Sequence, residues 1–261
     1  MRIQVHGHRG ARAVLPENTM PAFEYAIDQG ADAIEMDVVV TKDDVPVISH
    51  DPILKPAICR SPSGHRGIIR KLTFIELREW DCGSRVNPRF PNQKPVPGAR
   101  IPALDEVLSL AGRGSFLFNI EAKTGRSELD PNPVHFAQLL LKSIDGHSLR
   151  PRVIVQSFDF RILIAMKQLA PEIRQAALYE NARLGDFVSI ARTAGTQIVA
   201  PEKGMVTPAE VTAAHLAGLQ VIPWTANTPQ EWDVLISAGV DGIITDDPAA
   251  LIAHLRQKGL R

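Results

Sequence analysis

The sequence has no excess of either charge, because its 29 basic and 29 acidic side chains give a formal net charge of zero. Without a basic face, a chain has no general attraction to nucleic acid or to an anionic membrane surface. No stretch is apolar enough to span a membrane, and no signal peptide precedes residues 3–7, which already have the pattern of a strand. We therefore expect a cytoplasmic protein with no nucleic-acid partner and no stable membrane insertion. If an export signal has been removed, we expect a periplasmic or secreted protein instead.

Cysteine is also scarce. The chain contains two, Cys59 and Cys82, and although they could form one bridge, two cysteines do not make a disulfide framework. We therefore expect two unpaired thiols in a reducing compartment. The sequence leaves the oligomeric state open, a homo-oligomer included.

Short apolar runs alternate with amphipathic segments of helical length along most of the 261 residues, and apolar residues make up 44% of the chain, enough to build a core. Runs that are apolar throughout and rich in β-branched residues suit strands buried on both faces, and their alternation with helices predicts a parallel sheet. The predicted strands are 3–7, 33–38, 115–121, 152–157, 174–179, 197–200, 219–224 and 240–244. The predicted helices include 19–29, 104–111, 134–145, 160–169, 208–217 and 229–238.

Eight such units in a chain of this length fit an α/β fold, the TIM (β/α)8 barrel, as a single domain over residues 1–261. A doubly wound open sheet is the alternative, but no G-x-G-x-x-G follows the first strand to support it. Two regions break the alternation. Residues 39–50 indicate that the second strand continues into a tight turn and returns antiparallel. Residues 51–103, rich in Pro, Gly, Ser and Arg with one helical stretch near 73–80, are interpreted as an insertion near the barrel mouth.

Polar residues follow the apolar strands where those strands end, which is where the sites of TIM barrels lie. Glu35 and Asp37 are two residues apart on one strand and project to the same face, and Glu121 ends the next parallel strand. Three converging carboxylates are costly unless a positive group neutralises them. A hard divalent cation with oxygen ligands, Mg²⁺ or Ca²⁺, would do so. The alternative is that each carboxylate pairs with a separate Lys or Arg.

The predicted hairpin decides where His50 lies. In the expected register it returns close to position 36, and therefore beside Glu35 and Asp37. His8 ends the neighbouring first strand. Two imidazoles that flank one metal site can serve as general acid and general base near neutral pH. We expect the remaining histidines to be structural.

Arg9 and Lys123 place two cations at the same end of the predicted barrel. Both suit a phosphate group, Arg by its bidentate geometry and Lys as a point charge. A metal would polarise a non-bridging phosphoryl oxygen, and the cations would offset the charge that develops there. The combination predicts transfer at phosphorus.

The ordered set of motifs resembles the glycerophosphodiester phosphodiesterase family. Each motif alone is weak, but the set follows the family's order over nearly the whole chain. The motifs are His8-Arg9-Gly10-Ala11, Pro16-Glu17-Asn18-Thr19, Ala22-Phe23, Gly30-Ala31-Asp32, Ile34-Glu35-Met36-Asp37-Val38, Thr41-Lys42-Asp43-Asp44, His50-Asp51, Asn119-Ile120-Glu121-Ala122-Lys123, Gln156-Ser157-Phe158, Trp224-Thr225-Ala226-Asn227 and Asp241-Gly242-Ile243-Ile244-Thr245-Asp246-Asp247-Pro248.

The resemblance implies a TIM barrel that uses one divalent cation to hydrolyse small glycerophosphodiesters to an alcohol and sn-glycerol 3-phosphate. In the family mechanism a neighbouring glycerol hydroxyl attacks phosphorus, and water then opens the cyclic phosphate. We expect the side chain of Asn18 to order its own turn by local hydrogen bonds. The implied roles are His8 and His50 as the acid/base pair, Glu35, Asp37 and Glu121 as metal ligands, Arg9 and Lys123 as phosphate contacts, Trp224 as a wall of the alcohol or glycerol pocket, and Glu17, Asn18 and Gln156 as supporting residues.

Residues 52–62 depart from the family pattern, in which an Arg and a Thr-rich, Gly-containing stretch often follow, so the preferred head group stays open. A lysophospholipase D-like activity on lysolipids is one alternative, which an apolar, mobile insertion would favour over a closed polar pocket. A Schiff-base aldolase-type barrel using Lys123 is a second, but it leaves the histidines and carboxylates without a joint purpose. A non-catalytic binding barrel is a third, but the motif shows none of the damage it would require.

Overall fold

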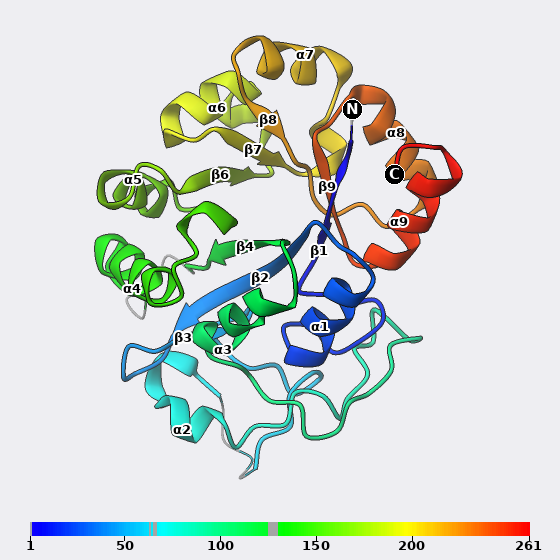
Figure 1. The fold of residues 1–261 in the computed structure, drawn as a ribbon. Coiled ribbons are helices and arrows are strands. Elements are labelled where there is room, and N and C mark those ends of the chain that lie inside the picture. The colour runs from blue at the N-terminus through cyan, green and yellow to red at the C-terminus, as the bar shows by residue number, and fades with distance from the viewer. Residues whose placement is uncertain (1, 63, 65–66, 125–129) are drawn as a thin grey trace.

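The computed structural model describes residues 2–62, 64, 67–124 and 130–261. Within these ranges, eight parallel strands form a nearly closed barrel in the order β8-β7-β6-β5-β4-β2-β1-β9 (Figure 1). Hydrogen bonds join the two ends of the sheet. The amides of Asp241 and Ile244 donate to the carbonyls of Val221 and Pro223, both at 3.0 Å. The strands are β1 (Gln4–Gly7), β2 (Ala33–Val40), β4 (Leu117–Ala122), β5 (Val153–Ser157), β6 (Arg174–Tyr179), β7 (Ile198–Pro201), β8 (Gln220–Val221) and β9 (Gly242–Thr245).

The predicted TIM barrel is thus confirmed, and the doubly wound alternative is wrong. Each predicted strand overlaps an observed one, although β8 is much shorter than the predicted segment 219–224. Pro223 has no amide hydrogen and cannot continue the ladder there. No helix in the described ranges is both long and apolar enough to cross a membrane.

Helices surround the barrel on its outer face (Figure 1). Their boundaries follow local sequence rules, as α8 illustrates. Thr228 and Glu231 form a capping box at its start, Pro229 occupies its first turn, and Gly239 ends it with a φ of 87°. The α-helices are α1 (Met20–Asp28), α2 (Phe74–Leu77), α3 (Leu104–Leu108), α4 (Pro133–Gly146), α5 (Phe160–Leu169), α6 (Phe187–Ala194), α7 (Pro208–Leu216), α8 (Pro229–Ala238) and α9 (Pro248–Gln257). The short 3₁₀ turns are η1 (Ile69–Lys71), η2 (Ser109–Arg113), η3 (Arg150–Arg152), η4 (Ala182–Leu184) and η5 (Lys203–Met205).

The strands bury apolar side chains on both faces, as their unbroken apolar runs predict. Val155 and Tyr179 belong to the large cluster that contains helix residues, so they point outward toward the helices. Ile154 and Leu178, on the alternate positions, belong to a separate cluster of strand residues that fills the barrel interior. The barrel is therefore a packed core, and only its strand ends are free to form a site.

The hairpin that follows β2 has the predicted form. The short strand β3 (Pro46–Ile48) pairs antiparallel with β2, with Val38 opposite Ile48 and Val39 opposite Val47. The amide of Ser49 continues this register by donating to the carbonyl of Asp37 at 2.9 Å. One further step brings His50 level with position 36, so the predicted register is confirmed.

The segment after β3, which includes α2, runs below the barrel in Figure 1. Its residues Leu54, Leu77, Trp80 and Ile101 form a second hydrophobic cluster together with residues of β2 and β3. Cys59 and Cys82 lie within it and form a disulfide. The expectation of two unpaired thiols is therefore wrong. Pairing was not visible in the sequence because it depends on two irregular segments folding against each other.

Replacing both cysteines by serine is expected to lower the free energy of unfolding by about 3 kcal/mol. The bridge closes a loop across a sequence separation of 23 residues, and such a closure restricts the unfolded chain. Denaturant unfolding of the oxidised protein and the double-serine variant would measure the difference. Reductant should destabilise the first protein and leave the second unchanged; equal midpoints before and after reduction of the natural protein would contradict this prediction.

Candidate active site

Three carboxylates converge at the ends of two adjacent strands. Glu35 and Asp37 project from β2, and Glu121 projects from β4, where it is the register partner of Asp37. One oxygen from each lies within 4.8 Å of the others. All three side chains are buried. The convergence predicted from the spacing of these residues is confirmed.

Two cations pair with two of these carboxylates, Asp37 and Glu121, so the alternative of a separate cation for each of the three is wrong. Arg9 Nε lies 3.1 Å from Asp37 Oδ2, while Lys123 Nζ lies 3.4 Å from Asp37 Oδ1 and 2.7 Å from Glu121 Oε1. Glu35 instead accepts hydrogen bonds from uncharged donors, the Arg9 amide at 2.8 Å and Gln156 Nε2 at 3.0 Å. Three ionised carboxylates would therefore carry one more charge than Arg9 and Lys123 balance.

Burying three carboxylates close together disfavours their charged forms and shifts their pKa values. Burial raises the pKa of Glu121 to about 7, against the opposing effect of Lys123. Burial also raises the pKa of Glu35 well above its ordinary value, with Asp37 and Glu121 adding to the effect. For Asp37, Arg9 and Lys123 outweigh burial and hold the pKa below its usual range. A protein without a bound cation would thus keep part of this cluster protonated near neutral pH.

The donor set fits a hard divalent cation. Asp37 Oδ1 and Glu121 Oε1 are fully buried, yet neither accepts a well-aligned hydrogen bond from any described residue. Lys123 lies close to both oxygens without satisfying that geometry. Carboxylate oxygens are the ligands that Mg²⁺ and Ca²⁺ prefer. Glu35, Asp37 and Glu121 are therefore the residues that would hold such an ion.

His8 follows β1 and is held by a carboxylate that follows β9. Its Nδ1 lies 2.6 Å from Asp246 Oδ1, and its Nε2 lies 3.9 Å from Glu35 Oε2. His8 and Arg12 outweigh burial and hold the pKa of Asp246 well below its usual range, so this carboxylate is ionised and can only accept. The Nδ1 atom of His8 therefore carries the proton, and Nε2 faces the carboxylate cluster.

Burial lowers the pKa of His8 to about 4, with Arg12 adding to this effect and Asp246 opposing it. The imidazole is thus neutral at pH 7, with an unprotonated Nε2. Arg12 Nε and Asn227 Nδ2 also bind Asp246, at 2.5 and 2.8 Å, and fix its orientation. This network gives His8 one tautomer and one position.

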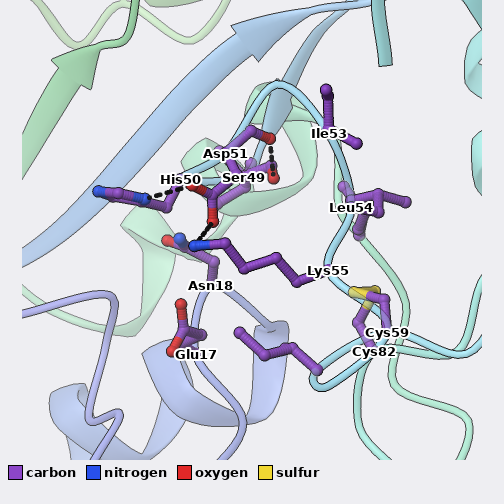
Figure 2. A pocket seen from close by; sticks show the side chains of 13 residues that line it. Glu17, Asn18, Ser49, His50, Asp51, Ile53, Leu54, Lys55, Cys59 and Cys82 are labelled. Atoms are coloured by element: carbon purple, nitrogen blue, oxygen red, sulfur yellow. Dashed lines mark hydrogen bonds and ion pairs between the residues drawn. A yellow bond between two sulfur atoms is a disulfide. The ribbon is translucent and has the colours of Figure 1, made fainter. Parts of the chain in front are cut away.

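His50 lies two residues beyond β3, where the β2–β3 hairpin returns. Figure 2 shows its ring beside Asp51, which also binds Lys55. His50 Nδ1 lies 3.3 Å from Asp51 Oδ1, and Lys55 Nζ lies 2.7 Å from Asp51 Oδ2. The disulfide lies farther along the same segment (Figure 2). His50 is more exposed than His8, so the two histidines approach the site from different environments.

The predicted supporting residues position the ligands and cations. Asn18 Nδ2 donates to Asp37 Oδ2 at 2.8 Å, so its side chain bonds across to β2, in contrast to the expected local bonds within its own turn. Arg9 Nη1 donates to Glu17 Oε1 at 2.6 Å, and Gln156 orients Glu35. The positive φ of Asn18, 57°, brings its amide group to this position.

Two positioning residues were missed by the sequence interpretation. Asp246 was given no role beyond its place in the last motif, although a closed barrel places the end of the last strand beside the first strand. Asn87, in the 51–103 segment, donates to Glu17 Oε2 at 2.8 Å and thereby joins this segment to Arg9. Asn87 lies in no periodic pattern, so its role could not be predicted.

A cavity of about 410 Å³ contains these groups. His8, Arg9, Glu35, His50, Glu121 and Lys123 all line it. Trp224 forms part of its wall, and its indole donates to the carbonyl of Ala200 at 2.8 Å while its ring meets Phe158 edge-on. The predicted catalytic, metal-ligand and phosphate-binding residues thus line one cavity, except Asp37, which is fully buried, and Trp224 forms part of the wall.

Comparison with known proteins agrees with this geometry. A glycerophosphodiester phosphodiesterase of Caldanaerobacter subterraneus subsp. tengcongensis is 34% identical over 259 residues, covering 99% of this chain and 100% of that protein. A solved structure from Silicibacter pomeroyi is 31% identical, covers 99% of this chain and 94% of its own, and superposes with a TM-score of 0.91. A phosphodiesterase of Oleispira antarctica, solved with its product sn-glycerol 3-phosphate, is 22% identical and has the same fold, with a TM-score of 0.84 over 98% of this chain and 97% of its own. Residues 8–250 match the model of the glycerophosphoryl diester phosphodiesterase family, and the chain belongs to that family.

Proposed function

We propose that this protein hydrolyses glycerophosphodiesters to an alcohol and sn-glycerol 3-phosphate, and that the reaction depends on one divalent cation, Mg²⁺ or Ca²⁺. The observation that carries the proposal is the carboxylate cluster of Glu35, Asp37 and Glu121, two of whose members line one cavity together with His8 and His50. Family membership supports it. So does the sn-glycerol 3-phosphate bound by the Oleispira protein.

The three carboxylates would hold the cation, which when bound would polarise a non-bridging phosphoryl oxygen. Arg9 and Lys123 would contact the phosphate and offset its developing charge. Burial alone would lower the pKa of Lys123, but Glu121 and Asp37 outweigh it and raise that pKa. Lys123 therefore stays charged, which suits phosphate binding and disfavours the Schiff-base alternative, since that chemistry needs a neutral amine.

The two histidines would move the protons. We assign His8 as the base, because its neutral ring presents Nε2 to the site. A glycerol hydroxyl would lose its proton to Nε2 while its oxygen bonds to phosphorus. The bond from phosphorus to the alcohol oxygen would break, and His50 would protonate that oxygen. Water would then open the cyclic phosphate, with the two histidines exchanging roles.

Asp246→Asn tests the assignment of His8. An amide in place of the carboxylate can donate to Nδ1, which favours the tautomer with the proton on Nε2 and removes the base. We expect kcat to fall at least about a hundredfold, with a smaller change in KM. The pH dependence of kcat separates this effect from simple unfolding. Asp233→Asn, which changes the exposed partner of His254, serves as control; unchanged kcat in Asp246→Asn would contradict the assignment.

A substrate panel tests the function itself. Glycerophosphocholine, glycerophosphoethanolamine and glycerophosphoglycerol would be assayed by coupled detection of glycerol 3-phosphate, with and without chelator. We expect metal-dependent release of glycerol 3-phosphate. Release of a phosphorylated alcohol in place of glycerol 3-phosphate, or no turnover of any member, would contradict the proposal.

Three further statements remain predictions. We propose that residues 1–261 form one domain, supported by the contacts of Asn87 with Glu17 and of Gln93 with the Arg12 carbonyl, at 2.8 and 2.7 Å. A cytoplasmic location and a possible homo-oligomer also stay predictions. The disulfide favours the alternative of an oxidising compartment, because reducing compartments keep most thiols unpaired. Fractionation of the native host would decide the location.

A further inference from the structure

A second cavity, of about 430 Å³, opens beside the one described above. The two cavities share four lining residues, His50, Glu121, Lys123 and Phe158. A phosphodiester placed at the carboxylate cluster would therefore extend into both. Such a substrate has two halves, the glycerol and the second alcohol. The site has two adjoining cavities to receive them, and each cavity is called an arm of the site below.

The walls of the second cavity are largely apolar, and a backbone bridge fixes one of them. Ile53 and Ile68 pair as an antiparallel bridge, in which the amide of Leu54 donates to the Gly67 carbonyl at 2.8 Å. Val39 of β2 forms another part of the lining. The side chains of Ile53 and Ile68 are only partly buried, so apolar surface is left for a ligand to cover.

The charged groups along this cavity are already engaged. Arg70 Nη1 donates to Asp44 Oδ1 at 2.7 Å. Asp159 Oδ2 accepts from Arg161 Nη2 at 2.7 Å, and Asp130 also has an interaction partner. These pairs reduce the polar recognition available to a ligand. Beyond the shared residues, burial of apolar surface is the main interaction that this arm offers.

The first cavity differs in character, because Arg12, Arg89 and Glu180 line it beyond the shared residues. Glycerol carries hydroxyl groups that require hydrogen-bonding partners when they leave water. The polar arm suits that half of the substrate. The apolar arm suits an alcohol whose carbon chain gains by leaving water.

We infer that the apolar arm, lined by Val39, Ile53, Ile68 and Phe158, binds the leaving alcohol and selects alcohols with an aliphatic chain. This inference rests on the proposed function and adds the class of alcohol that the site prefers. It assigns Ile53 and Ile68 as specificity-determining residues. Neither side chain takes part in the proton transfers or the contacts with phosphate.

The test uses sn-glycerol 3-phosphate esterified with ethanol, butanol or hexanol, each below its aggregation concentration. Glycerol 3-phosphate release by the oxidised, metal-loaded protein would be measured for each ester. Burial of one methylene corresponds to about a three- to fourfold gain. We expect kcat/KM to rise roughly a hundredfold from the ethyl to the hexyl ester. Equal kcat/KM across the series would overturn the inference and leave the proposed function intact.

Ile68→Ser and Ile53→Ser locate the effect. Each is expected to lower the hexyl-to-ethyl ratio of kcat/KM at least about fivefold, and this internal ratio does not depend on the fraction of protein that is folded. Ile75→Ser is the matched control, because Ile75 lies on α2 in the same segment with 79% of its surface exposed. It should leave the ratio unchanged. If both the Ile68→Ser and the Ile53→Ser protein kept the hexyl-to-ethyl ratio of the unmodified protein, the assignment would be overturned. If the unmodified protein hydrolysed none of the esters, the proposed function would be overturned.

Discussion

Replacing His8 or His50 by alanine is expected to lower kcat for glycerophosphocholine by about a thousandfold, with little loss of stability. A positioned general acid or base contributes roughly 10²–10⁴ in rate. His8 Nε2 faces Glu35 from the side of β1, and His50 lines the same cavity from the hairpin. Each would act on a different oxygen, so neither histidine can replace the other. Steady-state kinetics with coupled detection of glycerol 3-phosphate would measure the loss.

Stability measurements make this result interpretable. His50 is partly exposed, so its loss removes little packing. In the His8 variant, Asp246 keeps its bonds to Arg12 and Asn227, and we expect a cost of about 1 kcal/mol. His135→Ala is the matched control, because His135 is a partly exposed histidine that binds Asp44 outside the catalytic cavity. Normal turnover by either active-site variant would contradict the assignment, whereas His135→Ala should behave as the natural protein.

The features that the sequence predicted well are those set by short-range rules. A period of two places Glu35 and Asp37 on one face whatever the rest of the fold does. A tight turn fixes the register of the strand that follows it, which is why the position of His50 was predictable. The parallel neighbour of β2 then brings Glu121 level with Asp37. The period of a strand, the register of a tight turn and the pairing of parallel strands are together enough to predict most of the metal site.

The features that could not be predicted from the sequence depend on contacts between segments that are far apart in the chain. His8 and Asp246 are 238 residues apart and meet only because β9 pairs with β1. Asn87 and the two cysteines lie in a segment with few regular elements, where no periodicity indicates which way a side chain points. The same limit applies to Asn18, whose positive φ directs its amide to Asp37 and away from its own turn.

Removal of divalent cations is expected to lower turnover by at least about a thousandfold, and Mg²⁺ or Ca²⁺ should restore it. Without the ion, Arg9 and Lys123 are the Arg and Lys side chains among the described residues that pair with this cluster, and they pair with Asp37 and Glu121. Chelator treatment followed by titration with each ion would test this. Chelator that is already saturated with Mg²⁺ is the control, and full activity of a verified metal-free protein would contradict the prediction.

The same cluster makes the stability of the metal-free protein depend on pH. The pKa of Glu121 is raised to about 7 in the folded state, so folding favours its protonated form. That contribution is complete below the ordinary pKa of a glutamate and is lost as pH rises through 7. We expect the free energy of unfolding to fall by on the order of 2 kcal/mol between pH 5 and pH 8.

A bound cation should reverse this trend, because it replaces the proton as the group that neutralises the cluster. Mg²⁺ or Ca²⁺ should therefore raise Tm more at pH 8 than at pH 5, since the ligands must be deprotonated to bind. Glu121→Gln provides the comparison, because an amide of the same shape cannot titrate. Its metal-free form should lose less stability between pH 5 and pH 8 and should gain less from the cation. An identical pH profile in the variant would show that Glu121 does not carry the proton, and the proton would then have to be assigned to Glu35.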